Sequence, residues 1–171
     1  VAKVLISYDS PFWLDEGLSG FGFADISSGN MLTVYADASD PSSGKGVIVC
    51  LITARQYDML NAIKGDENIL LNSNDAKKKA VLSDLAMFLG DKAKSPETFD
   101  IADWPAEQYV QGSYAGYMTP LGWTRFGTAL IENHGSVFWA GTETSDSWPG
   151  YFEGGIQSGE RAAAELLKSI E

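Results

Sequence analysis

Short apolar segments separated by turn residues occupy the first part of this chain, and they restrict it to folds that contain a sheet. The segments are Val1–Tyr8, Gly20–Ala24, Met31–Tyr35 and Val47–Ile52. Runs of this length that are rich in β-branched and aromatic residues and end at turn residues predict β-strands. The single cysteine, Cys50, lies inside the last of them, so we expect it to be a buried structural thiol.

Two helices are predicted after these strands. Ala54–Ile63 is the first, and Lys64–Leu71 is predicted to be an irregular connection. The second, Asp75–Leu89, follows the candidate N-cap residues Ser73 and Asn74 and has apolar side chains at helical spacing. These apolar residues are Ala80, Leu82, Leu85, Ala86 and Leu89. Gly90 is placed to end this helix.

The rest of the sequence predicts two further strands and then a helix. Glu97–Trp104 and the apolar Ser136–Ala140 predict strands, and the latter is expected to be buried. Gln157–Ile170 predicts a helix. The order of elements predicts an α+β fold with a mixed, largely antiparallel sheet flanked by helices, followed by a C-terminal strand–loop–helix. We place the domain boundary between residues 130 and 131.

Charge and composition exclude several function classes. With 44% hydrophobic residues the chain is globular, and its net charge of −11 argues against nucleic-acid binding. One histidine, His134, and one cysteine argue against a zinc site. The sequence contains no run of about 18 apolar residues, the length that a membrane-spanning helix needs. We expect no signal peptide, and since one cysteine cannot form an intrachain disulfide, we expect a cytoplasmic protein.

The C-terminal segment carries the most specific motif. It comprises Gly141–Thr144, Trp148–Gly154 and Ser158–Ala163. This pattern resembles the C-terminal flavin-binding signature of the flavin-containing monoamine oxidase family. The physical chemistry agrees, because Gly150 and Gly154 allow close backbone approach to a flat ligand. A helix that begins near Tyr151 or Phe152 would direct backbone N–H groups at the flavin ring.

The resemblance implies roles for individual residues. An upstream segment, Asp103–Tyr114, resembles the family segment that brings aromatic residues to the flavin. Carried over, Trp104 corresponds to a tryptophan that faces the flavin. Tyr114 and Tyr151 correspond to the two tyrosines of the aromatic cage that holds the amine. The residues implied to line the flavin mainly through backbone are Gly141, Thr142, Gly150 and Phe152. Without the resemblance, both tyrosines would be ordinary core or surface residues.

One position departs from the mammalian members of the family. There the residue before the first cage tyrosine is a cysteine that forms a thioether with the flavin, whereas this sequence has Ser113. Serine cannot form that bond, so the resemblance implies FAD held non-covalently.

The N-terminal half resembles the substrate domain of the same family. The resemblance implies that Phe23, Val34, Ala36 and Leu51 face the substrate cavity. Val34 and Ala36 are two residues apart, so a strand would place both on one face. The alternative is that all four are core residues. An aromatic and aliphatic lining would suit an apolar amine better than a polyamine.

The first half of the family's cofactor site is absent from this sequence. No G-x-G-x-x-G motif for the FAD pyrophosphate is present. The chain therefore resembles the C-terminal part of a larger enzyme whose N-terminal dinucleotide-binding portion is missing. We expect this part alone to be inactive and free of FAD. An exposed apolar face on the last helix is also expected to permit homo-oligomers. Its residues are Ile156, Ala163, Leu166, Leu167 and Ile170.

The resemblance implies that the parent enzyme oxidises an amine to an imine, which hydrolyses to an aldehyde, while O2 is reduced to hydrogen peroxide. The amino-acid sequence of Trp148–Gly154 favours an oxidase of the monoamine type. Two alternatives stay open: a related amino-acid or polyamine oxidase, and a non-catalytic binding or interaction module with the same fold.

Overall fold

The computed structural model describes residues 1–25, 27, 29–64 and 73–170. These residues form two compact units, Val1–Ser113 and Tyr114–Glu171. The predicted irregular connection Lys64–Leu71 lies outside the described residues except for Lys64. The predicted functional boundary between residues 130 and 131 differs in position from the division into units and stays a prediction.

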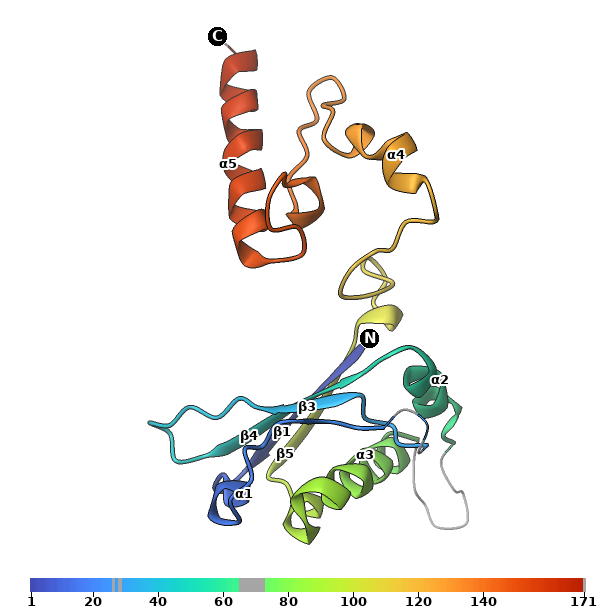
Figure 1. Ribbon diagram of the computed structural model, residues 1–171, viewed down its shortest axis with the longest axis vertical. Helices are drawn as coiled ribbons and strands as arrows, with labels where there is room; N and C mark the ends of the chain where they lie inside the picture. Colours follow the sequence, from blue (N-terminus) through green and yellow to red (C-terminus); the bar gives the residue numbers. More distant parts are fainter. Residues whose placement is uncertain (26, 28, 65–72, 171) are drawn as a thin grey trace. The chain divides into compact units, whose positions relative to one another are not determined.

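The first unit is built on one sheet (Figure 1). Its strands are β1 (Ala2–Tyr8), β2 (Gly22–Phe23), β3 (Val34–Asp37), β4 (Gly46–Ile52) and β5 (Thr98–Asp103). Their order is β2-β3-β4-β1-β5, and every neighbouring pair is antiparallel. The predicted α+β class is confirmed, and the described sheet is antiparallel throughout.

The two faces of the sheet have different environments. Along β1, Ala2, Val4, Ile6 and Tyr8 are buried, whereas the residues between them are partly or fully exposed. Cross-strand pairing extends the buried face, because Cys50 lies opposite both Val4 and Tyr35. Burial also raises the pKa of the Cys50 thiol to about 12, as expected of an inert structural cysteine.

Helix α3 (Ser73–Leu89) covers the buried face of the sheet (Figure 1). Its side chains at Val81, Leu82, Leu85 and Leu89 join the same core as the strands. Gly90 ends the helix as predicted, with a φ of 83° and its N–H donating to the carbonyl oxygen of Ala86 at 2.9 Å. The described helix already includes both residues predicted to cap it.

Shorter elements complete the first unit. They are α1 (Phe12–Asp15), α2 (Ala54–Ala62) and the 3-10 turns η3 (Asp91–Lys94) and η4 (Trp104–Ala106). Buried aromatic rings of α1 pack on the end of β1, where the Phe12 and Tyr8 ring centroids are 5.2 Å apart. This packing closes the core at one end of the sheet.

The second unit contains two α-helices and short turns in its described residues. These are α4 (Gly122–Phe126), η5 (Thr128–Leu130), η6 (Thr142–Thr144) and α5 (Phe152–Ser169). Helix α5 begins at Phe152, which agrees with the helix start expected near Tyr151 or Phe152 from the flavin-binding motif and lies before the Gln157 expected from periodicity. Gly154 and Gly155 in its first turn have low helix propensity, so periodicity alone did not indicate this start.

The prediction of a strand at Ser136–Ala140 is wrong. In the part of the chain that the structure describes, this segment makes only an isolated antiparallel bridge between His134 and Val137. Val137 and Trp139 are both exposed. A strand requires a partner along its length, and apolar composition alone does not supply one.

None of the helices within the described ranges is long and apolar enough to cross a membrane.

We expect Leu85→Ala to lower the free energy of unfolding by about 2–5 kcal/mol, because it removes a fully buried side chain and leaves a cavity. Met87→Ala on the same helix is the matched control, since Met87 is 70% exposed. The control should change stability by less than about 0.5 kcal/mol. Urea unfolding followed by far-UV circular dichroism measures both, and equal losses would contradict the position of the core.

Candidate functional site

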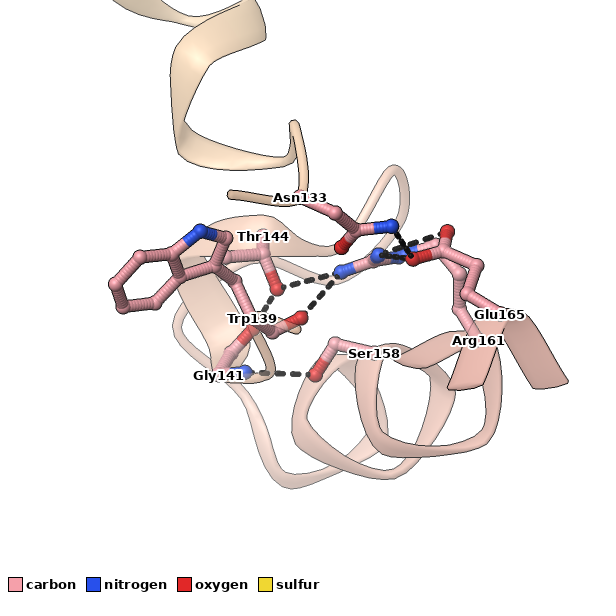
Figure 2. A network of polar contacts seen from close by, with 7 residues as sticks. All are labelled: Asn133, Trp139, Gly141, Thr144, Ser158, Arg161 and Glu165. Atoms are coloured by element: carbon pink, nitrogen blue, oxygen red, sulfur yellow. Dashed lines mark hydrogen bonds and ion pairs between the residues drawn. The ribbon is translucent and has the colours of Figure 1, made fainter. Parts of the chain in front are cut away.

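A network of polar contacts fixes the loop before α5 to the body of that helix (Figure 2). The Arg161 guanidinium donates through Nη2 to the carbonyl oxygen of Trp139 at 2.9 Å and to Thr144 Oγ1 at 3.1 Å. Its Nη1 pairs with the carboxylate of Glu165 at 3.1 Å. Hydrogen bonds from Asn133 and then from Arg161 lower the pKa of Glu165, so this carboxylate stays ionised at neutral pH.

Ser158 makes a second connection between the loop and the helix (Figure 2). Its buried hydroxyl accepts from the Gly141 N–H at 3.0 Å and donates to the carbonyl oxygen of Gly155 at 2.9 Å. Gly141 has a φ of 155°, a conformation that side chains disfavour, and Thr144 Oγ1 donates back to its carbonyl oxygen. Together these bonds hold the η6 turn in one conformation.

These anchoring roles were missed by the sequence analysis, although Ser158 and Arg161 belong to the motif it identified. The available signal was spacing: Ser158, Arg161 and Glu165 recur at helical intervals and therefore share one face of α5. The motif residues thus divide into those that can face a ligand and those that hold the loop.

The loop enters α5 through a tight turn. Trp148 has a φ of 57° and Gly150 one of 83°. A Cβ at Gly154 would lie 2.2 Å from the Trp148 carbonyl oxygen, so only glycine permits this packing. The close approach at Gly154 is therefore made by the chain itself. The rings of Trp148 and Tyr151 meet edge to face with centroids 6.0 Å apart.

The N-terminal end of α5 presents backbone donors and exposed rings. Tyr151 is the N-cap residue in an extended conformation, and its side chain makes no capping hydrogen bond to the helix. First-turn N–H groups of an uncapped helix are available to an external acceptor. Tyr151 is 65% exposed and Phe152 is 96% exposed. This end of the helix can therefore contact a flat polar ring.

Trp104 and Tyr114 lie on either side of the division between the units. Trp104 begins η4 in the first unit and is partly exposed, whereas Tyr114 opens the second unit and is 75% exposed. The structure gives the position of each of these two rings within its own unit. Ser113 donates to the carbonyl oxygen of Val1 at 3.0 Å, so its hydroxyl has a structural partner.

The four residues predicted to line a cavity share the sheet face opposite the core. Phe23 pairs with Val34, and Val34 pairs with Leu51, which places all three in one row across β2, β3 and β4. Ala36 lies two residues along β3 on the same side. None of the four belongs to the buried core, and Phe23 is 71% exposed. The alternative that they are core residues is wrong for this chain.

The open face therefore forms an apolar wall. Leu5 and Val49 continue it onto the central strands, where they lie opposite each other in the register of β1 and β4. Such a wall can exclude water and contact an apolar substituent. Charged side chains share this face toward β1 and β5, because Lys3 lies opposite Leu51 and Asp100 lies opposite Leu5. No group of three or more His, Cys, Asp or Glu residues within the described ranges could hold a metal ion.

The expected apolar face of α5 is present. All five residues predicted for it are exposed: Ile156, Ala163, Leu166, Leu167 and Ile170. Homo-oligomerisation through this face stays a prediction.

We expect Arg161→Gln to speed amide hydrogen exchange over Gly141–Ser145 by about tenfold, because the η6 turn loses its charged anchor. Lys168→Gln is the matched control, since Lys168 is an exposed cation on the same helix. Exchange in β1 and β4 should not change in either variant. Unaltered exchange at Gly141 in Arg161→Gln would show that the network does not hold the turn.

Comparison with known proteins is consistent with this geometry. The sequence model of the flavin-containing amine oxidoreductases matches residues 1–167. An L-amino acid dehydrogenase of Synechocystis sp. is 42% identical over 96% of this chain and 32% of its own length. Amine oxidase B of Cavia porcellus is 32% identical over 99% of this chain and 31% of its own length.

Solved structures of other proteins share the fold of this chain. Cyclohexylamine oxidase from Brevibacterium oxydans matches with a TM-score of 0.81 and 29% identity, over 99% of this chain and 35% of its own. A putrescine oxidase matches with a TM-score of 0.81 at 24% identity, over 98% of this chain and 34% of its own, which shows the fold alone. This chain spans about a third of the length of these proteins.

Proposed function

Because this chain belongs to the flavin-containing amine oxidoreductase family, we propose that it is the C-terminal part of an enzyme that oxidises an amine with FAD. The observation that supports this proposal is the loop from Gly141 to Tyr151, which Ser158 and Arg161 hold in place. This loop leads into a helix that has no side-chain cap and has exposed rings at its start. The product would be an imine that hydrolyses to an aldehyde, with O2 reduced to hydrogen peroxide.

The residues present fit the ring end of FAD. Gly141 and Thr142 would contact it from the η6 turn, and Gly150 and Phe152 from the entry to α5, mainly through backbone. No heavy atom other than those of its chain neighbours lies within 4 Å of the position of a Cβ at Gly150, so a flat ring can approach there. The helix N-terminus favours negative charge. When bound, FAD supplies the acceptor for the hydride equivalent that leaves the substrate carbon.

The chain's own residues would orient the substrate. Tyr114 and Tyr151 would hold the amine between their rings, whose electron-rich faces attract a cationic or developing-positive nitrogen. Trp104 would contact the flavin. Phe23, Val34, Ala36 and Leu51 would form the wall against the apolar part of the substrate and exclude water from it. Orientation of this kind contributes to rate because the reacting groups no longer have to be brought together in each encounter.

The intact protein would need further residues for the rest of the cofactor. The chain contains no G-x-G-x-x-G motif and covers about a third of its relatives, so the pyrophosphate contacts would come from the missing N-terminal portion. We therefore propose that the isolated chain is inactive and does not retain FAD. A cytoplasmic location also stays a prediction.

A second candidate function is oxidation of an L-amino acid. It is supported by the 42% identity to a protein named as an L-amino acid dehydrogenase. The distinguishing assay supplies the intact protein with amines and with L-amino acids and follows hydrogen peroxide and reduction of an artificial acceptor. Turnover of amines alone supports the first proposal. Purification of the intact protein without any flavin would support a non-catalytic module.

We expect the intact protein to release its FAD on acid precipitation, because Ser113 has no sulfur for a thioether bond. Absorbance of the supernatant in the visible band of oxidised flavin measures the released fraction. Ser113→Ala is the control, since it also lacks sulfur and should release the same fraction. Flavin that stays with the precipitate of the unaltered protein would contradict the assignment of Ser113.

We expect Tyr151→Ala in the intact enzyme to lower kcat by about tenfold to hundredfold while FAD is retained, because the substrate loses one wall of its cage. Tyr151→Phe keeps the ring and should recover most of the rate. Tyr117→Ala is the matched control, an almost fully exposed tyrosine of the same unit. Equal kinetics in Tyr151→Ala and the control would contradict the cage role.

A further inference from the structure

The position of Trp104 is determined by the residue before it. Asp103 is the last residue of β5 and pairs with Ala2 of β1, so its backbone belongs to the sheet. Trp104 then begins η4, and Pro105 restricts the backbone of this turn. The ring therefore projects from a short turn whose orientation depends on how the turn is attached to the sheet.

The Asp103 side chain provides that attachment. Its Oδ1 accepts the backbone N–H of Ala106 at 3.3 Å and so caps the turn. The same oxygen accepts the phenolic hydroxyl of Tyr57 at 2.7 Å. One carboxylate oxygen thus connects the turn that carries Trp104 to helix α2.

Tyr57 is itself held in place. Its ring packs against the core of the first unit, and Asn61 lies one turn further along α2. Asn61 in turn accepts from Lys77 Nζ of α3 at 2.8 Å. Burial first, and then the bond to Asp103, raise the pKa of Tyr57, so it remains a hydroxyl donor at neutral pH. Helix α2, which carries the Tyr57 donor, is therefore joined to α3.

We propose that Tyr57 is a positioning residue for Trp104, acting through the carboxylate of Asp103 on the η4 turn. The inference rests on the proposed function, in which the Trp104 ring contacts the flavin. Tyr57 itself touches neither flavin nor substrate in this scheme. A tyrosine on α2 would thereby determine the geometry of a flavin contact that lies outside its own helix.

The test compares two tyrosine hydroxyls in the intact FAD-bound protein. Tyr57→Phe removes only the hydroxyl that bonds Asp103. Tyr8→Phe is the matched control, because the Tyr8 hydroxyl donates to the carbonyl oxygen of Ala93 at 2.9 Å, in the core and away from η4. The measurements are amide exchange at Ala106, the flavin absorption spectrum, kcat and the melting temperature.

In Tyr57→Phe we expect exchange at Ala106 to become about tenfold faster and kcat to fall roughly threefold to tenfold, with a shifted flavin spectrum. Tyr8→Phe should lower the melting temperature while leaving the spectrum and the Ala106 exchange unchanged. Asp103→Asn keeps an acceptor oxygen, so it should retain more of the rate than Asp103→Ala does.

Failure of the inference is distinguishable from failure of the proposed function. A protein that binds FAD but shows the same Ala106 exchange and kcat in Tyr57→Phe overturns the positioning role. Equal changes in Tyr57→Phe and Tyr8→Phe overturn it too, because they reflect a general loss of stability. A flavin-free intact protein overturns the proposed function and with it the link from Trp104 to catalysis.

Discussion

The alternation of side chains along an antiparallel sheet is the constraint on which the first unit depends. Residues Val4, Cys50 and Tyr35 share a row and face the core under α3, while the adjacent row of Phe23, Val34 and Leu51 necessarily faces the other way. The same backbone that buries one face therefore exposes an apolar wall on the other. A shift of one residue in the β3–β4 register would exchange the two faces, so the core and the proposed substrate wall are determined together.

The second unit uses hydrogen bonds where the first uses apolar packing. Its loop has few buried side chains, and α5 holds it through Ser158, Arg161 and Glu165 on one helical face (Figure 2). A charged group shared among a carbonyl, a hydroxyl and a carboxylate is well suited to this task, because a guanidinium can donate in several directions at once. The rings of Tyr151 and Phe152 stay exposed because these anchors stabilise the loop without them.

Much of the fold was predictable because it depends on local periodicity. The apolar runs around Val4 and Cys50 are strands, the stripe through Leu82, Leu85 and Leu89 is a helix, and Gly90 ends it. Prediction failed where a partner decides the outcome. Ser136–Ala140 has the composition of a buried strand but makes only one bridge in the described residues. The site residues were proposed from a resemblance, and the structure adds their attachments.

The sequence by itself determined most of the elements, because these depend on local periodicity, and it indicated the family through its C-terminal motif. The residues proposed to contact a flavin or an amine follow from that resemblance. Only the tertiary structure decided which residues hold others in place. Asp103 and Tyr57 are 46 positions apart, and Gly141 and Ser158 are 17 apart, with nothing in their spacing to pair them. A hydrogen bond across such distances exists only after strands and helices have packed, since packing alone brings donor and acceptor within reach.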